Sequence, residues 1–416
     1  MHNQLLILSR DRDSVTAWRS GVSLHGHTRH SQESLGFIAT FLKRRSVSRR
    51  WFAAQEEKCR RTTGIVLDLE RAYWTPPLCE RTAHAVEQRQ IEQLGLHPMV
   101  SLTDHDRIDA CLLLRQDPAL RATPISTEWT IHFGKAVFHF GIHNLPAESA
   151  QALMAAMREA TALGDEDRIL KLFAELSSLP EVLIVFNHPL WNFFDIPADR
   201  FTYDLTRFLE SANRYLHAFE LNGMRNHAEN RAVLQLAAAW NQVVISGGDR
   251  HGCEPNASLN LTNAADFPEF VAEIRDGRQS TVLVMPQYGL PLGWRFYRNF
   301  THVVADYPTH PEGRRLWDER TYHPDRNGCI VPMIGLWKNT APDFLKTMFA
   351  AAMMATRVPF DGLLRWWKQG ENESLQLPVA PPWAPTARAG MRSSSDPASE
   401  ASLEDCLYRS GEPAAD

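Results

Sequence analysis

Short apolar runs alternate with longer segments of helical pattern along most of this chain of 416 residues. Buried strands that are each followed by a helical segment are typical of a parallel sheet, closed or open, with crossover helices. The alternation therefore predicts an α/β fold. The expected strands are Val22–Leu24, Met99–Leu102, Val182–Phe186, Ala218–Leu221, Val243–Ile245 and Thr281–Val284, and the expected helices cover 78–95, 148–176, 203–215, 228–240 and 266–276.

Several segments depart from this alternation. The run AVFHFGI at 136–142 follows a turn and predicts a hairpin strand. Residues 34–76 separate the first strand from its helix, so we expect an insertion there. After residue 290 the sequence becomes aromatic-rich and irregular, which favours an appended segment, 291–377, packed on the remainder of the fold. Residues 378–416 are rich in Pro, Ser and Ala, a composition that cannot support a core, and are expected to form a disordered tail.

The charge balance excludes a protein that binds polyanions over its whole surface, because 44 Lys and Arg face 49 Asp and Glu. The stretch 43–61 is locally basic, and we interpret it as a solvated helix face, with a nucleic-acid contact as the alternative. Six scattered cysteines without a CxxC pair indicate free thiols in a reducing, cytoplasmic compartment. The apolar segment 344–355 is too short to span a bilayer, so we expect no transmembrane segment. A helix packed on the fold is the preferred interpretation of 344–355, over a membrane-surface or dimer contact.

Histidines and carboxylates gather at the carboxyl ends of the expected strands, where an α/β barrel builds its active site. The sequences there are LHGHTRHSQES, SLTDHD, ISTEWTIHFGKAVFHFGIH, VFNHP and ISGGDRHG. Strand alternation would place His25 and His27 on one face, and Asp249 and His251 on another. The glycines before Asp249 would allow the backbone to approach a bound group. These side chains suit a transition-metal cluster. The candidate ligands are His25, His27, His105, Glu128, His139, His188, Asp249 and His251.

In this order, the motifs resemble those of the polymerase and histidinol phosphatase (PHP) superfamily of metal-dependent phosphoesterases, over about residues 20–290. The resemblance implies a distorted (β/α)7 barrel and two or three divalent ions of Mn, Zn or Fe. It also implies hydrolysis by a hydroxide that bridges two ions. The implied assignment is His25, His27, Glu128 and Asp249 to the first ion, Glu128, His139 and His188 to the second, and His105 and His251 to the third.

One ligand departs from the family pattern. Family members place Asp or His in the loop after the second histidine, where this chain has Gln32 and Glu33. Glutamine is a poor ligand for a divalent transition metal, so we expect Glu33 to complete the third site; otherwise the centre would be dinuclear. The amidohydrolase-type metal barrel also begins with HxH, but it usually has a bridging modified lysine, and no such lysine is found here.

Other polar residues near the motifs receive supporting roles. Asp104 is expected to orient a ligand imidazole, and His30 is a candidate acid for the leaving group. Residues expected to contact the substrate phosphate, with surface salt bridges as the alternative, are Arg225, His227 and Arg250. Residues expected to be structural are His132, His143 and His217.

The predicted function is therefore that of a metal-dependent phosphoesterase acting on a small phosphate ester or a nucleotide. Two alternatives stay open. One is a nuclease or phosphoesterase acting on oligonucleotide ends, and the other is a non-catalytic binding module that keeps metal for stability.

Overall fold

The structure of the chain is a computed structural model that describes residues 2–36, 46–310, 313–337, 347, 350 and 354. The predicted tail 378–416 and most of the predicted helix 344–355 lie outside the described residues. None of the described helices is both long enough and apolar enough to cross a membrane.

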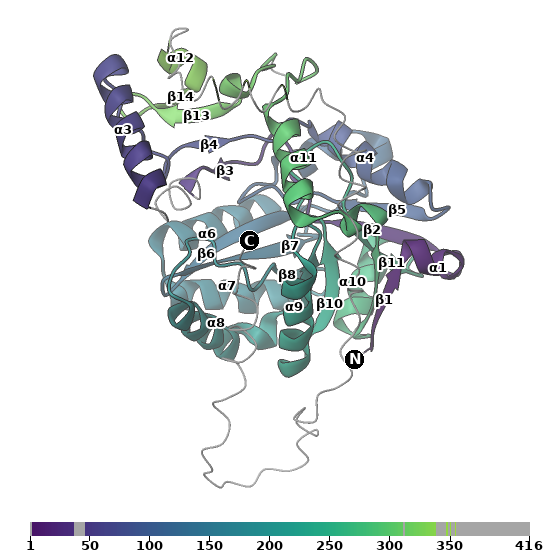
Figure 1. The fold of residues 1–416 in the computed structure, drawn as a ribbon. Coiled ribbons are helices and arrows are strands. Elements are labelled where there is room, and N and C mark those ends of the chain that lie inside the picture. The colour runs from purple at the N-terminus through teal and green to yellow at the C-terminus, as the bar shows by residue number, and fades with distance from the viewer. Residues whose placement is uncertain are drawn as a thin grey trace, which may run out of the picture.

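Two five-stranded sheets form the centre of the molecule (Figure 1). All six expected strands are present, and the expected hairpin is formed by β6 and β7. Two further strands, β1 and β11, were not predicted. The first sheet has the order β1 (His2–Ile7), β12 (Gln279–Val284), β11 (Ser258–Thr262), β2 (Ser20–Leu24) and β5 (His97–Ser101); the second has the order β10 (Val243–Gly247), β9 (Ala218–Asn222), β8 (Leu183–Asn187), β7 (Ala136–His143) and β6 (Thr127–Phe133).

The expected (β/α)7 barrel is not confirmed, because the ladders of the described residues do not close. Strand β11 is antiparallel to both of its neighbours, and β7 is antiparallel to β6 and β8. Between β10 and β11 a side chain replaces the ladder: Asn260 accepts from the Ser246 N–H at 2.7 Å and donates to the Ser246 carbonyl at 3.0 Å. Elsewhere the two sheets meet at isolated bridges, Gly26 with Arg250 and His105 with Glu128.

Each predicted helical segment forms a helix over the two sheets, but 148–176 is divided, and α1 and α5 were not predicted. The expected helix 148–176 is two helices, because Gly164 has a left-handed φ of 61° that ends the first, and the Asp165 side chain caps the second. Their buried side chains, among them Phe173 of α7, share one aromatic core with Trp129 and Phe140 of the second sheet. The helices are α1 (Leu8–Val15), α4 (Glu80–Glu92), α5 (Asp109–Leu114), α6 (Ala150–Leu163), α7 (Glu166–Ser178), α8 (Ala198–Ala212), α9 (His227–Ala239) and α10 (Phe267–Arg275).

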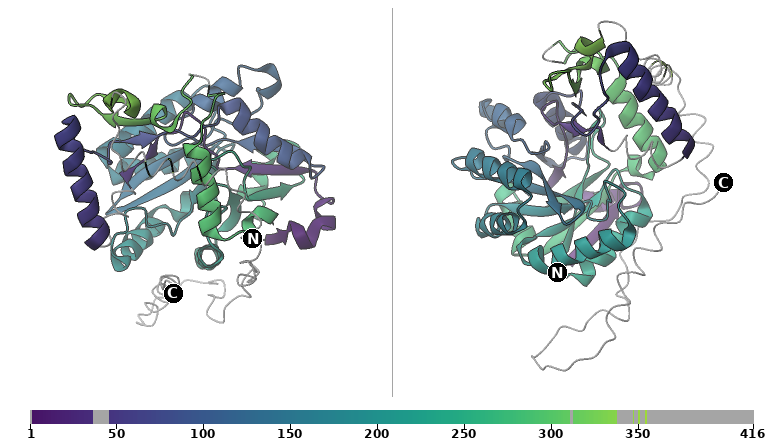
Figure 2. Two further views of the ribbon diagram at one scale, coloured as in Figure 1. Left: turned by 45° about the horizontal axis from the view of Figure 1, so that its top comes forward. Right: turned by 90° about the vertical axis from the view of Figure 1, so that its left-hand side faces the viewer.

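A third, four-stranded sheet joins the expected insertion to the expected appended segment. Its order is β14-β13-β4-β3, so strands from both segments pair directly. It has a small apolar core of Leu35, Cys59, Ala72 and Met333. Figures 1 and 2 show this sheet outside the two larger ones. Its elements and neighbours are β3 (Glu33–Ser34), α3 (Ser46–Thr63), β4 (Tyr73–Trp74), α11 (Leu292–Val304), β13 (Thr321–Pro324), β14 (Ile330–Pro332) and α12 (Met333–Trp337).

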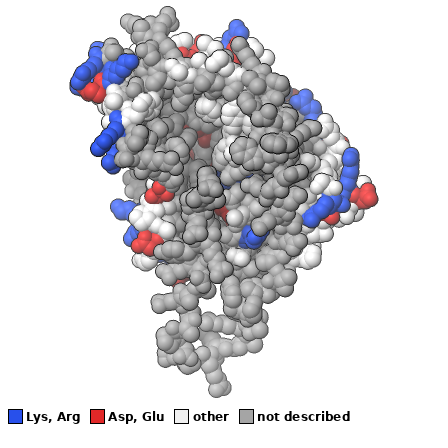
Figure 3. Space-filling model, viewed as in Figure 1, with Lys and Arg blue, Asp and Glu red and all other residues white. Residues whose placement is uncertain are grey.

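The described part of the basic stretch 43–61 lies on α3. Blue side chains are visible at that edge of the molecule in Figure 3. Arg60 and Arg61 both pair with Glu57 on the same helix, at 2.8 and 2.6 Å. Such pairs are typical of a solvated helix face.

Candidate metal centre

Three of the candidate ligands lie just beyond the ends of strands. Strand β2 ends at Leu24, β8 at Asn187 and β10 at Gly247. The residues His25, His188 and Asp249 then take left-handed φ values of 62°, 30° and 55°. Strand alternation alone therefore does not place His25 beside His27 or Asp249 beside His251, although His25 and His27 do gather with Glu128. Left-handed backbone at a non-glycine residue costs about 1–3 kcal/mol, and it turns each side chain out of the strand and into the cluster.

Glu128 on β6 lies at the centre of the cluster and is completely buried. Each of its two carboxylate oxygens faces a different set of imidazoles. Oε2 lies 3.1 Å from His25 Nε2 and 3.3 Å from His27 Nε2 and from His105 Nε2. Oε1 lies 3.4 Å from His139 Nδ1 and 3.2 Å from His188 Nε2. A carboxylate in this position can bridge two cations.

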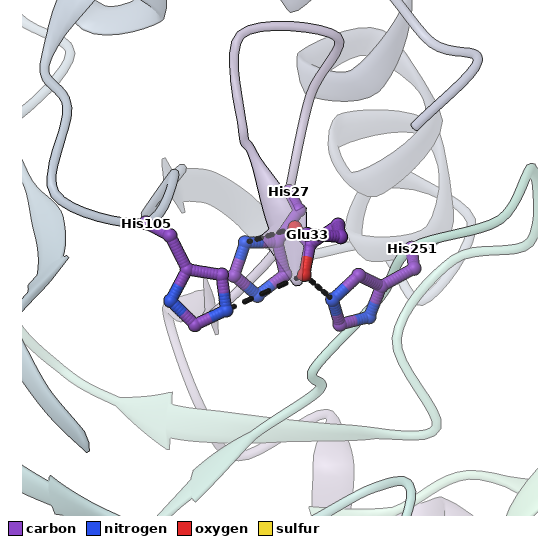
Figure 4. Close-up of side chains that lie close together, drawn as sticks. All are labelled: His27, Glu33, His105 and His251. Carbon is purple, nitrogen blue, oxygen red and sulfur yellow. Dashed lines mark ion pairs between the residues drawn. The ribbon is translucent and has the colours of Figure 1, made fainter. Parts of the chain in front are cut away.

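Glu33 occupies a second centre, between three imidazoles (Figure 4). Its Oε2 lies 3.0 Å from His251 Nε2 and 3.4 Å from His105 Nε2, and its Oε1 lies 3.6 Å from His27 Nδ1. Alternation along the chain buries Glu33 and exposes Gln32. The carboxylate, and not the amide, therefore faces the cluster.

The ligand atoms form four overlapping groups, each with its atoms within 4.8 Å of one another. The partition differs in part from the one that the resemblance implies, because His188 gathers with His25 and Asp249, and His105 also gathers with Glu128 and His139. The groups are His27, Glu33, His105 and His251; His25, His27 and Glu128; His25, His188 and Asp249; and His105, Glu128 and His139.

The chemistry of these atoms fits divalent metal ions. Five buried atoms of the candidate ligands have no hydrogen-bond partner among the described residues: Nε2 of His25, Nε2 of His27, Nδ1 of His139, Oε1 of Glu33 and Oε2 of Glu128. A buried polar atom without a partner costs about 1–3 kcal/mol. Metal coordination would satisfy these atoms together, and imidazole nitrogens with carboxylate oxygens suit Mn, Fe and Zn.

The pKa values of the metal-free cluster also suit cation binding. Burial lowers the pKa of His25, but the carboxylates of Glu128 and Glu220 outweigh burial and raise it well above its usual value. Burial raises the pKa of Glu128, and the surrounding imidazoles more than reverse this. Against burial, neighbouring carboxylates raise the pKa of His105 to about 10. His25 and His105 therefore hold protons that a metal ion would displace, whereas burial lowers the pKa of His27 to about 3 and that of His139 to about 4.

Glu220 on β9 was missed by the sequence interpretation. Its Oε1 lies 2.5 Å from His25 Nδ1, and its Oε2 accepts from the His188 N–H at 2.9 Å and from Asn222 Nδ2 at 2.8 Å. A carboxylate that holds one imidazole nitrogen directs the other nitrogen at a metal. The available signal was a carboxylate between the apolar residues Phe219 and Leu221 of a buried strand.

Asp104 does not orient an imidazole as expected. Its carboxylate accepts from the Thr28 N–H at 2.6 Å and from the Thr28 hydroxyl at 2.7 Å. It therefore holds the loop after His27. The glycines before Asp249 also have a different role, because a Cβ at Gly247 would lie 1.6 Å from Glu220 Oε1 and one at Gly248 would lie 1.8 Å from Asn256. They make room for these two side chains.

Of the three residues expected to contact phosphate, Arg225 is the one whose contact with a candidate ligand fits this role. Arg250 is buried, and its Nε donates to Glu87 Oε1 at 2.8 Å, so its guanidinium points into the protein and we do not retain it as a substrate contact. His227 packs edge-on against Tyr288. Arg225 lies at the cluster, with Nη2 4.0 Å from Asp249 Oδ2.

The other histidines that the sequence singled out lie outside the ligand groups. His30 Nε2 is 3.2 Å from Glu80 Oε2. His143 Nδ1 bonds the Ser101 hydroxyl at 2.8 Å, and His217 Nδ1 accepts from the Ile184 N–H at 2.9 Å. His132 is exposed on β6.

No protein-family model matches the chain, and no curated protein matches it by sequence. Two solved structures resemble parts of it. One is a provisionally assigned metal-dependent phosphoesterase from Bifidobacterium adolescentis, 17% identical, with a TM-score of 0.28, covering 48% of this chain and 90% of its own. The other is an amidohydrolase from Chromobacterium violaceum with bound sulfate and no metal, 14% identical, with a TM-score of 0.31, covering 55% of this chain and 87% of its own. At these TM-scores neither resemblance assigns a function.

Proposed function

We propose that this chain is a metal-dependent phosphoesterase of the PHP type, acting on a small phosphate ester or a nucleotide. The observation that carries the proposal is the position of Glu128, whose two oxygens face separate sets of imidazoles within 3.1–3.4 Å. A bridging carboxylate surrounded by histidines is an arrangement for adjacent divalent ions. The proposed ligands are His25, His27, Glu33, His105, Glu128, His139, His188, Asp249 and His251.

When bound, two or three divalent ions supply an activated water molecule and neutralise charge on the phosphoryl group. The protein's own contribution is to hold the ligands in place before substrate arrives. Glu220 fixes the ring of His25 through its Nδ1, and Asn187 donates to Glu128 Oε1 at 3.0 Å. These contacts leave His25 Nε2 and Glu128 Oε2 directed at the cluster.

With three divalent ions bound, the charge of the cluster would favour an anionic substrate. Three divalent ions would carry more positive charge than the four carboxylates of Glu33, Glu128, Glu220 and Asp249 can cancel. The excess positive charge matches a phosphate ester better than a neutral amide or ester.

Arg225 is the proposed cationic contact for the substrate. Its guanidinium stacks on Trp191 at 4.1 Å, which fixes its plane beside the cluster. Its Nε is buried without a hydrogen-bond partner among the described residues, although Glu229 Oε1 lies 3.5 Å away. A planar guanidinium held in this way can donate to the oxygens of a phosphate. His30 stays a proposed acid for the leaving oxygen.

The test is a panel of phosphomonoesters, phosphodiesters, 3′,5′-bisphosphate nucleotides and short oligonucleotides, with Mn²⁺, Zn²⁺ or Fe²⁺ added separately. We expect metal-dependent turnover of small esters or nucleotides. Turnover of oligonucleotides alone would favour the nuclease alternative. Metal binding without turnover of any ester would favour a binding module, and less than one ion per chain would remove the basis of the proposal.

A further inference from the structure

The proposed ligand Glu33 lies on a strand that is too short to be stable without its neighbours. Strand β3 has two residues, and its backbone is fixed by pairing with β4, where Glu33 lies opposite Trp74. The adjacent Leu35 N–H donates to the Ala72 carbonyl at 3.0 Å. Strand β4 is also two residues long, and it is fixed in turn by β13, where Trp74 lies opposite Thr321. The register of Glu33 therefore depends on a segment almost 290 residues later in the chain.

Register decides which side chain enters the metal centre. Neighbouring residues of a strand point to opposite faces, so a slip of one residue would replace the buried Glu33 with Gln32 or Ser34, which are now exposed. Trp74, directly opposite Glu33, lies on the same face, and its ring is 5.8 Å from that of His251. The pairing therefore places both a ligand and a covering aromatic ring at the third centre.

Arg320 fixes this pairing at the entry to β13. Arg320 is 1% exposed. Nη2 donates to the carbonyls of Val303 at 2.7 Å and Ala305 at 3.0 Å, at the end of α11, and Nη1 donates to the Thr75 carbonyl at 3.5 Å. The Thr75 N–H donates back to the Arg320 carbonyl at 2.9 Å. No carboxylate of the described residues lies within ion-pair distance of Arg320, so its bonds join three chain segments by their backbones.

Helix α11 also connects these contacts to Arg225, which lies beside the candidate ligand Asp249. Helix α11 is attached to the loop after β9 through Arg295, whose Nη2 donates to the Arg225 carbonyl at 2.9 Å. Arg320 joins the end of α11 to the residue after β4, and β4 pairs with β3. The planar guanidinium of an arginine presents several N–H donors in a fixed arrangement, so it can bond several carbonyls at once. A lysine ammonium in its place lacks this fixed geometry.

We propose that Arg320 is a positioning residue for Glu33, and that the described parts of the appended segment, 292–310 and 313–337, are thereby part of the third metal site. This inference rests on the proposed metal centre. It predicts that loss of the Arg320 contacts weakens the third ion selectively, because the ligands of the other ions belong to the two larger sheets.

The test compares Arg320→Gln with Arg275→Gln. Arg275 is a matched control, because its guanidinium also donates to backbone carbonyls, those of Val182 at 2.6 Å and Ser177 at 2.8 Å, without belonging to the third sheet. Mn²⁺ content is measured by elemental analysis, and Mn²⁺ affinity by calorimetric titration. We expect Arg320→Gln to lose about one Mn²⁺ per chain while the other ions stay, and amide exchange in the metal-free protein to accelerate at Leu35. Arg275→Gln should keep all ions.

Wild-type Mn²⁺ content and affinity in a folded Arg320→Gln protein would overturn the inference and leave the proposed function standing. Less than one Mn²⁺ in the wild-type protein would instead refute the proposed function. Equal loss of the third ion in the Arg275→Gln control would show that general destabilisation is the cause, and would also overturn the inference.

A second variant carries the test if Arg320→Gln fails to fold. Tyr73 and Tyr322 pair across β4 and β13 with their rings stacked at 4.8 Å. Directly paired residues have Cα separations that a disulfide can bridge. In Tyr73→Cys/Tyr322→Cys, with the exposed Cys329 replaced by Ser, reduction should weaken the third Mn²⁺ site and oxidation should restore it. Equal affinity in the two redox states would overturn the inference.

Discussion

Replacing Glu220 with glutamine tests whether the carboxylate behind His25 governs metal affinity. Glutamine keeps the size of the side chain, and its amide oxygen can still accept from the His188 N–H and from Asn222 Nδ2, which both bond Oε2. The contact that it loses is the 2.5 Å bond between Oε1 and His25 Nδ1. Only one of three contacts is therefore removed.

The magnitude follows from that single contact. A hydrogen bond to a charged group contributes about 1.5–3 kcal/mol to stability. Loss of a carboxylate that orients a metal-binding histidine lowers metal affinity by roughly 10- to 100-fold, which is the same range of free energy. We therefore expect Glu220→Gln to weaken Mn²⁺ by roughly 10- to 100-fold at the centre that contains His25, with the Glu33 centre unchanged.

The assay is a calorimetric Mn²⁺ titration together with turnover of a chromogenic phosphomonoester. Asp204→Asn is the matched control, since Asp204 is also a completely buried carboxylate that accepts from a backbone N–H, that of Lys135 at 2.8 Å, but belongs to no ligand group among the described residues. Glu220→Gln with wild-type affinity and turnover would refute the orienting role. The same loss of affinity in Asp204→Asn would assign the effect to stability.

Three further predictions use other parts of the chain. Glu128→Ala should abolish turnover and lower Mn²⁺ content, because it removes the carboxylate proposed to bridge two ions. The control His132→Ala, at an exposed position, should keep both turnover and Mn²⁺ content, and comparable losses in the two variants would refute the bridging role. Glu33→Gln should cost about one Mn²⁺ per chain with the fold intact, whereas the exposed Gln32→Ala should keep it; the reverse result would mean that β3 has the other register. Burial and Arg275 lower the pKa of His217 to about 3. A folded-state pKa below the unfolded value means that the contribution of His217 to stability is full above about pH 6.5 and is lost as pH falls toward 3, by about 2 kcal/mol at pH 5. His217→Gln should flatten this acid dependence in urea unfolding at pH 5 and 7, and an unchanged slope would contradict the assignment.

The local sequence was sufficient to predict six strands and the hairpin of the two larger sheets, and the segments that carry the candidate ligands. Apolar runs such as Val182–Phe186 mark buried strands wherever they occur, and a polar cluster at each strand end is visible without any long-range contact. The break at Gly164 was missed because helical periodicity continues on both sides of it. Strand β11 was missed because it contains polar residues, Ser258 and Asn260, at positions that are buried in the structure. Its sequence therefore lacks the apolar run by which the other buried strands were predicted.

Other features depend on contacts between distant parts of the chain. The partner of His25 is Glu220, 195 residues away, and no spacing rule connects them. The left-handed backbone at Asp249 cannot be read from residue type, because Asp is common in ordinary turns. The pairing of Trp74 with Thr321 depends on two strands too short to give any periodic signal. In each case tertiary contacts decide the conformation, and local propensity does not.

The candidate metal centre lies where the backbone ladders of the described residues are incomplete. Its ligands come from all three sheets: His25 follows a strand of the first, Glu128 lies in the second and Glu33 lies in the third. The isolated bridges that connect the two larger sheets are at the same place, because they involve Glu128 itself and the residue after His25. Ions coordinated there would cross-link the sheets at the points where hydrogen-bond ladders do not. The unpartnered ligand atoms and the left-handed strand ends are thus two results of one arrangement, in which the folded chain brings together atoms that a metal ion satisfies.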